Sequence, residues 1–295
     1  MTRHIVTAED FENCLEHVRK QVHDNPKTDP AQGIFGPNSQ TWRSAGDWVG
    51  FLASAKIFMM QESHPVIGKA LNDHSNVEDN PTGRWKRSFD FVNTITFAPL
   101  DVAFQKARQL WVIHSRFSGE LLDGTSYSAN EEDALLWVAG NMYQAMDEMH
   151  DMSYGPRTKK EKREHYKEFK LFASMFGVSL DTIPPAYHDF QNYYQDKISS
   201  GDLHVQKQTK ERFWYFANKF LSGTFRGFNP LATRYVSLTS GLLPSTVREQ
   251  YDMPWNFEDK VTFYSTKVLL KAYPKLPATV RENIYYKQHV KGLYK

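Results

Sequence analysis

The chain has 295 residues, of which 40% are hydrophobic and 14% are aromatic, a composition typical of a globular protein with a substantial core. Its 36 basic and 34 acidic side chains nearly balance at a net charge of +2, which argues against nucleic-acid binding as the main role. The single cysteine, Cys14, excludes an intrachain disulfide and any Cys-x-x-Cys site for zinc, an iron–sulfur cluster or covalently attached haem.

The N-terminal residues and the apolar stretches indicate where in the cell the protein is expected. The first residues, MTRHIVTAEDFENC, reach acidic side chains at once and lack the apolar core of a signal peptide, so we expect no secretory leader. The longest apolar stretch, WVGFLASAKIFMM, is too short to span a bilayer and is interrupted by Lys56. These features predict a cytoplasmic protein without an integral membrane span.

Helical periods dominate the chain after residues 24–45, which are rich in Pro, Gly, Asn and Asp and are predicted to be a loop. Residues 46–61 are predicted to form a helix whose apolar face consists of Trp48, Phe51, Leu52, Ala55 and Met59. Further helices are expected to begin near Pro65, with Ser63 as the cap, and near Pro81.

The segment between Pro99 and Gly119 contains a histidine where a helix would normally bury a leucine. Its apolar positions recur at alternating spacings of four and three, which places them on one helical face: Ala103, Ala107, Leu110, His114 and Phe117. This stripe predicts that His114 faces the interior. The small side chains of Ala103 and Ala107 are expected to leave room beside its ring.

The second half of the chain has the same helical character. A helix is predicted after Asn130, with acids in its first turn and one apolar stripe: Leu135, Val138, Met142, Met146 and Met149. Residues 158–177 are predicted to form a mixed-charge helix, with the basic run from Arg157 to Arg163 on its solvated face. The best strand signal is residues 232–241. We therefore expect a mainly α protein with a single large helical domain.

Several metal and nucleotide sites are excluded by their motifs. The 11 histidines include no Glu-x-x-His set for a di-iron bundle, no His-Glu-x-x-His zinc motif and no His-x-Asp/Glu facial triad. Gly-x-Gly-x-x-Gly, Walker and Gly-x-Ser-x-Gly motifs are also absent. A lone histidine such as His114 suffices for haem, because the porphyrin supplies four ligands of its own. The alternative interpretation is a core histidine that is hydrogen-bonded to a carbonyl.

Two arginines are candidates for binding an anion. Arg84 and Arg87 lie three residues apart and share one side of a predicted helix with Ser88. Together they can grip a propionate or polarise dioxygen. The alternative is a surface arginine pair that forms ion pairs with Asp79 or Asp90.

Tyr127 and the methionine stripe are further candidates near the helix that follows Asn130. Tyr127 can donate a hydrogen bond into a pocket, although a part-buried tyrosine is ordinary. Met142, Met146 and Met149 can supply a soft axial ligand, although helical methionine stripes usually serve core packing.

Five segments follow one another in a recognisable order: GIFGPNSQTWR, MMQESHPVIGKALNDHS, NPTGRWKRSFDFVNTITF, VIHSRFSG and YSANEEDALLW. In register, they resemble the rubber oxygenase (latex-clearing protein) and mpaB-type oxygenase catalytic domain family, domain of unknown function 2236. The resemblance covers residues 33–255. It implies that residues 1–32 are an N-terminal helical extension and that residues 256–295 are a C-terminal helical extension packed on the same domain.

The resemblance implies a globin-like helical core that holds haem b without a covalent bond. The axial ligand of the family corresponds to His114, which would bind the iron. The Arg-x-x-Lys/Arg-Thr signature of the family matches Arg84, Arg87 and Ser88, with arginine in place of lysine and serine in place of threonine. A guanidinium stays protonated and cannot coordinate iron, so we expect an open or water-filled position on the far side of the haem.

The function implied by the resemblance is an oxygenase that uses dioxygen at ferrous haem to attack a carbon–carbon double bond. The expected substrate is a small apolar metabolite, isoprenoid or otherwise unsaturated. Arg84 and Tyr127 would contact the cofactor, and Arg84, Arg87 and Ser88 would serve catalysis. The alternatives are a haem peroxidase or other oxidative tailoring enzyme, and a non-enzymatic haem sensor or carrier.

Overall fold

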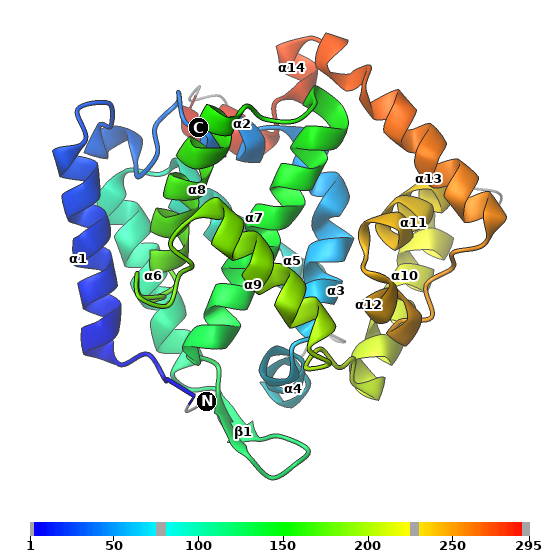
Figure 1. Cartoon of the computed structure of the whole chain (residues 1–295), viewed down its shortest axis with the longest axis horizontal. Coiled ribbons are helices and arrows are strands. Elements are labelled where there is room, and N and C mark those ends of the chain that lie inside the picture. The colour runs from blue at the N-terminus through cyan, green and yellow to red at the C-terminus, as the bar shows by residue number, and fades with distance from the viewer. Residues whose placement is uncertain (1–2, 75–80, 225–229, 291–295) are drawn as a thin grey trace.

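In the computed structural model the helices are arranged around one long central helix, α7 (Figure 1). The structure describes residues 3–74, 81–224 and 230–290. The elements of the first half are α1 (Ala8–Asp24), η1 (Pro30–Gln32), α2 (Gln40–Ala45), η2 (Trp48–Ala53), α3 (Ser54–Glu62), α4 (Pro65–His74), α5 (Pro81–Phe97), α6 (Leu100–His114), β1 (Ser118–Glu120) and β2 (Ser126–Ser128).

In the described part of the second half, all the regular elements are helices. Its elements are α7 (Glu132–Tyr154), α8 (Lys159–Ser174), α9 (Tyr187–Ser199), α10 (Lys207–Thr224), α11 (Pro230–Leu242), α12 (Ser245–Gln250), α13 (Phe257–Leu270), η3 (Tyr273–Lys275), α14 (Ala278–Arg281) and α15 (Ile284–Val290). Helices α1 and α6 lie on one side of α7, and α11 and α13 lie on the other (Figure 1). The chain is therefore mainly α, as predicted.

The N-terminal helix α1 packs on α6. Phe11 stacks on Trp111 with ring centroids 5.7 Å apart, and the guanidinium of Arg108 donates two hydrogen bonds of 2.7 Å to the carboxylate of Glu12. Ala103 and Ala107 of α6 are almost completely buried in the main hydrophobic cluster. Helix α6 is thus fixed on its outer side by α1, which leaves its opposite side for the interior.

The C-terminal segment is joined to the same body through Asp47. The hydroxyl groups of Tyr154 and Tyr273 both donate to its carboxylate, and Arg281 lies 3.5 Å from the same group. Nearby, the side-chain amide of Asn283 donates to a backbone carbonyl at the end of α2. These contacts support the proposal that residues 256–295 pack on the same domain.

Three predictions for residues 24–61 need correction. Residues 24–45 are not all loop, because α2 begins at Gln40, where the Ser39 hydroxyl accepts a hydrogen bond from the Trp42 amide. Residues 46–61 divide into the 3₁₀ helix η2 and α3. The predicted apolar face is wrong: Trp48 is 41% exposed while Ala53 is buried. A 3₁₀ helix has three residues per turn, so a face drawn at 3.6 residues per turn rotates away from the core.

The strand prediction for residues 232–241 is also wrong, because this segment lies in α11. Within this helix the hydroxyl of the β-branched Thr239 is satisfied locally, since it donates to the carbonyl of Tyr235. Ser63 does not cap α4, since its hydroxyl donates to the carbonyl of Met60. The antiparallel pair β1–β2, in which Ser118 faces Ser128, was not predicted. Among the described residues, no helix combines the length and apolarity needed to cross a membrane.

A candidate active-site cavity

A cavity of about 590 Å³ is lined by residues of helices α2 to α8, and its volume is within the range of cofactor and small-molecule sites. Its wall is mostly apolar. The methionine stripe predicted on α7 contributes much of this wall: Leu135, Val138, Met142 and Met146. Met149, the last residue of that stripe, packs instead in a second hydrophobic cluster. Three aromatic side chains of α8 and the turn after it add to the apolar lining: Phe169, Phe172 and Phe176.

His114 is the last residue of α6 and lines this cavity, as its stripe predicted. Its side chain is half-buried, and burial lowers its pKa from 6.5 to about 4. No hydrogen bond joins its ring to another residue in the part of the chain that the structure describes. The imidazole is therefore neutral at pH 7 and has an unshared electron pair on one ring nitrogen.

The residues beside His114 differ from those predicted. Ala103 and Ala107 belong to the core and do not reach the cavity. The wall next to His114 is formed by larger residues of the same helix, Leu110 and Ile113 among them. The prediction that the two alanines make room beside the ring is therefore wrong, because the stripe of α6 is wide enough to serve the core and the cavity with different positions.

Helix α5 contributes the predicted polar pair. Arg87 and Ser88 both line the cavity, and Arg87 is exposed, which places it at the rim. Asp90, the predicted partner of an arginine, pairs with Lys106 instead. Arg84 lies one turn before Arg87 in α5, but its side chain is outside the described residues, as is Asp79.

Tyr127 does not reach the cavity. Its side chain is 2% exposed, and its hydroxyl donates to Oδ2 of Asp73 at 2.7 Å. Burial, together with the Asp73 carboxylate, raises the pKa of this phenol above its usual value. The predicted cofactor contact by Tyr127 therefore has no support in this geometry. The hydroxyl of this β2 residue is instead satisfied by a carboxylate of α4.

Two other histidines near this region have partners. His74 lines the cavity, but its ring stacks on Phe117 and its Nε2 lies 3.1 Å from the carbonyl oxygen of Ser118. His64 is buried outside the cavity lining, with its Nε2 3.0 Å from Oδ2 of Asp133. His114 is thus better placed than either to bind a ligand inside the cavity.

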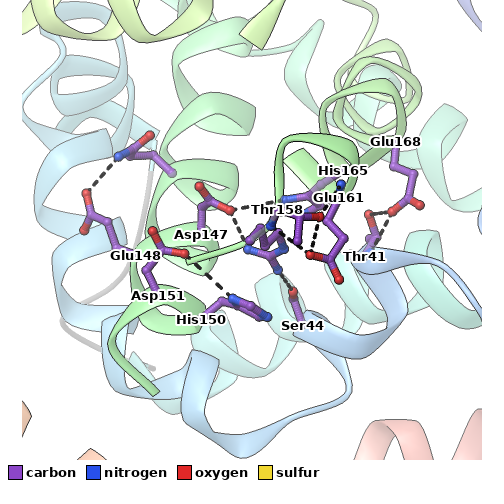
Figure 2. A network of polar contacts seen from close by, with 12 residues as sticks. Thr41, Ser44, Asp147, Glu148, His150, Asp151, Thr158, Glu161, His165 and Glu168 are labelled. Atoms are coloured by element: carbon purple, nitrogen blue, oxygen red, sulfur yellow. Dashed lines mark hydrogen bonds and ion pairs between the residues drawn. The ribbon is translucent and has the colours of Figure 1, made fainter. Parts of the chain in front are cut away.

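Sequence reasoning missed a polar cluster that borders the cavity at its α8 wall (Figure 2). His165 lines the cavity, and its Nδ1 lies 3.5 Å from Oδ1 of Asp147. Arg157 forms a buried ion pair with the same carboxylate and donates to the hydroxyl of Ser44. The prediction of a solvated basic run is wrong for Arg157, whose side chain is 1% exposed.

A signal for His165 was present in the sequence. His165, Phe169, Phe172 and Phe176 recur at spacings of four, three and four, the same pattern that singled out His114. The high charge of the surrounding segment hid this stripe, because lysine and glutamate make up half of α8.

The cavity fits a haem group by its chemistry. Its wall is apolar, it holds a neutral imidazole with a free electron pair, and an arginine stands at the rim where propionates would need a cation. No group of three or more His, Cys, Asp or Glu side chains is arranged to hold a metal ion within the described ranges. An iron bound at His114 would therefore need its other ligands from a cofactor.

The fold and the cavity together define a mainly α protein with a mostly apolar cavity of the size of a small-molecule site. Residues 42–272 match the family model of the catalytic domain of the ER-bound oxygenase mpaB/B′ and rubber oxygenase. The chain belongs to this family and is an oxidoreductase of the oxygenase type. Neither a curated protein nor a solved structure matches it. The globin-like character of its core accordingly stays a prediction.

Proposed function

We propose that this chain is a haem b-dependent oxygenase that oxidises a small, apolar, unsaturated metabolite inside the cavity. The observation that supports this most strongly is His114, a neutral imidazole in the wall of an apolar cavity, in a chain that belongs to an oxygenase family. Haem, when bound there, supplies the iron at which dioxygen is activated. The cytoplasmic location stays a prediction.

In this proposal His114 holds the iron through its free ring nitrogen. Because its pKa is about 4, few protons compete with the metal for that nitrogen at neutral pH. Its place at the end of α6 keeps the ring position fixed, since α6 is anchored to α1 on one side and packs against α5 on the other. The second ring nitrogen remains available for a carbonyl or water that orients the ring.

The apolar wall binds the substrate and excludes water. Val138 and Met142 of α7 face the same space as Phe169 of α8, so an unsaturated chain finds hydrophobic contacts on opposite helices. Cleavage of a carbon–carbon double bond by one dioxygen molecule leaves one oxygen atom on each carbon, and therefore consumes no external reductant.

In this proposal the arginines of α5 stabilise negative charges of the reaction and of the cofactor. We assign to Arg84 the stabilisation of negative charge that develops on oxygen, an interaction that is strong in a site without water. Arg87, at the rim, is suited to bind a propionate, and the hydroxyl of Ser88 can donate a hydrogen bond within the same wall. Its guanidinium stays protonated, so Arg87 would not bind an iron as a neutral lysine can.

Oxygen uptake tests this function. The haem-supplied chain is mixed with apolar alkenes that range from monoterpenes to squalene, and dioxygen is followed with an electrode. We expect uptake that depends on one of these alkenes and is lost in His114→Ala. Turnover that requires hydrogen peroxide and not dioxygen would identify a peroxidase. Haem binding without either reaction would identify a carrier or sensor.

A further inference from the structure

Helix α13 has one face packed on the body of the molecule. Figure 1 shows it along the outer edge, beside α11. On its inner face Phe263 is buried against α11, so closely that a Cβ atom at Gly241 would lie 2.3 Å from the phenyl ring. The hydroxyl of Ser237, also in α11, donates to Oδ1 of Asp259 at 3.1 Å. These contacts fix the rotation of α13 about its axis and so decide which side chains point outward.

The outward face of α13 carries a row of large apolar side chains. Its members recur at spacings of four, three and four, which places them on one line along the helix: Phe257, Val261, Tyr264 and Val268. Their exposed fractions are 79%, 52%, 60% and 66%, respectively. Apolar residues on a protein surface are normally scattered singly, so a continuous row of this kind indicates a surface that meets a partner or a membrane.

Lysines accompany the apolar row on one side. Lys260, Lys267 and Lys271 recur at spacings of seven and four, so they form a second row, roughly 70° around the helix from the first. The lysine ion pairs within the described ranges all involve other lysines. The lysine row is therefore available for negative charges outside the chain.

The charge beside the apolar row favours one kind of partner. Cations next to an apolar row are typical of helices that lie in the interface of a bilayer, where the lysines meet anionic headgroups. Tyr264 suits this place, because its ring is apolar and its hydroxyl is polar. A second copy of the chain fits less well, since two α13 helices packed antiparallel about a twofold axis would bring their lysine rows together.

We propose that α13 docks the chain on a bilayer that contains anionic phospholipids, with the apolar row in the interface and the lysine row at the headgroups. The chain is then a peripheral protein, held by the outer face of a helix whose inner face belongs to the fold. The described residues of α13 lie outside the cavity lining, so this inference goes beyond the proposed function and depends on neither haem nor turnover.

Co-sedimentation with vesicles tests the inference. The purified, haem-supplied chain is mixed with sucrose-loaded vesicles of phosphatidylcholine alone, or of three parts phosphatidylcholine to one part phosphatidylserine, and partition coefficients are measured. We expect binding to the mixed vesicles at least about tenfold tighter than to phosphatidylcholine, because three lysines gain from the anionic surface. This difference should shrink as the salt concentration rises.

Two double variants separate the contributions of the two rows. Val261→Ser/Val268→Ser removes apolar contacts and should weaken binding to the mixed vesicles by roughly tenfold or more. Lys267→Gln/Lys271→Gln should weaken the same binding by about 10- to 30-fold and leave the binding to phosphatidylcholine unchanged. Circular dichroism checks that both variants keep their helices.

Matched controls come from other helices. Val102→Ser/Val112→Ser changes two valines of α6 that are 46% and 45% exposed, and Lys160→Gln/Lys167→Gln changes two exposed lysines of α8. Both controls should bind the mixed vesicles within about twofold of the unchanged chain, because their side chains lie away from the docked surface.

A dye reports insertion directly and does not depend on the double variants. Val268→Cys is labelled with an environment-sensitive fluorophore, while Cys14 is buried and protected from the reagent. Emission should shift to shorter wavelength when mixed vesicles are added, whereas the same dye at Val102→Cys should show no shift.

Four outcomes would overturn the inference: binding to neither vesicle, equal binding to both, equal effects of the α13 variants and their controls, or no shift of the dye on α13. A dimer that Val261→Ser/Val268→Ser dissociates, in a chain that binds no vesicles, would assign the apolar row to self-association instead. Loss of haem or of oxygen uptake would contradict the proposed function and leave this inference standing.

Discussion

The side-chain amide of Asn130 donates a hydrogen bond of 3.0 Å to the hydroxyl of Ser115. This bond joins the residues just before α7 to the residue that follows His114, so the two helices that form opposite parts of the cavity wall meet at a fixed point. Asn130 is 3% exposed and also lies 3.4 Å from the carbonyl oxygen of Trp111. The position of His114 thus depends on a residue that does not line the cavity.

Loss of this contact should destabilise the fold. Asn130→Ala removes the hydrogen bond of a buried amide to Ser115, whose hydroxyl keeps its bond to the carbonyl of Trp111, and we expect a loss of about 0.5–1.5 kcal/mol in the free energy of unfolding. The midpoint of urea denaturation measures this loss. Asn192→Ala, at an exposed position of α9, is the matched control and should shift the midpoint little. An unchanged midpoint in Asn130→Ala would show that water replaces the amide.

The buried ion pair of Asp147 and Arg157 makes a stronger prediction. Arg157→Leu leaves the Asp147 carboxylate buried without its cation, which should cost about 3–5 kcal/mol of unfolding free energy. The double variant Asp147→Leu/Arg157→Leu removes both charges and should recover much of this loss. Chemical denaturation measures both variants. A double variant less stable than Arg157→Leu would contradict an origin in the unpaired charge.

Stability should depend on pH through His165. The pKa of His165 falls from 6.5 when unfolded to about 4 when folded, so between these values the unfolded chain binds more protons. Stability is then fully present above pH 6.5 and decreases as the pH falls toward 4, by at most about 1.4 kcal/mol per pH unit for this group.

The groups that face His165 are Asp147, Arg157, Tyr143 and His150. Unfolding of the haem-free chain between pH 7 and 5 measures the effect. His165→Phe should reduce the slope in this range and leave the part that comes from His114, whereas His188→Phe, on the exposed side of α9, should not change it. Equal slopes in all three proteins would show that His165 is protonated in the folded state.

Substitution of Arg84 is expected to reduce activity much more than haem binding. If its charge stabilises negative charge on oxygen, Arg84→Ala should keep most of the haem and lose activity by about 10²–10³-fold. Arg84→Lys should restore little, because a point charge on a flexible stem does not replace a planar guanidinium. Steady-state rates and haem content are measured together. Complete loss of haem would make Arg84 a propionate ligand, and full activity would make it a surface residue.

The single-helix stripes were the most predictable part of the site. The period of α6 placed His114 at the interior, and that of α7 placed Leu135 and Met142 there, because spacing alone decides which side chains share a face. Spacing does not distinguish the core from a cavity within the core. For that reason Ala107 was assigned to the wrong surroundings.

Contacts between distant segments were beyond the sequence. Tyr127 of β2 contacts Asp73 of α4, and Arg157, between α7 and α8, contacts Asp147 and Ser44; folding brings these separate segments together. The local sequence of a basic run does not show which of its residues will form an ion pair with a buried carboxylate. The buried cluster around His165 therefore emerged only from the three-dimensional arrangement.

The absorption spectrum of the purified, haem-supplied chain tests the central claim most directly. We predict a Soret band with close to one haem b per chain, releasable by acid–organic extraction, retained in His165→Phe and lost in His114→Ala while circular dichroism shows that this variant keeps its helices. A chain without a Soret band, or a His114→Ala variant with an unchanged band, would contradict the account.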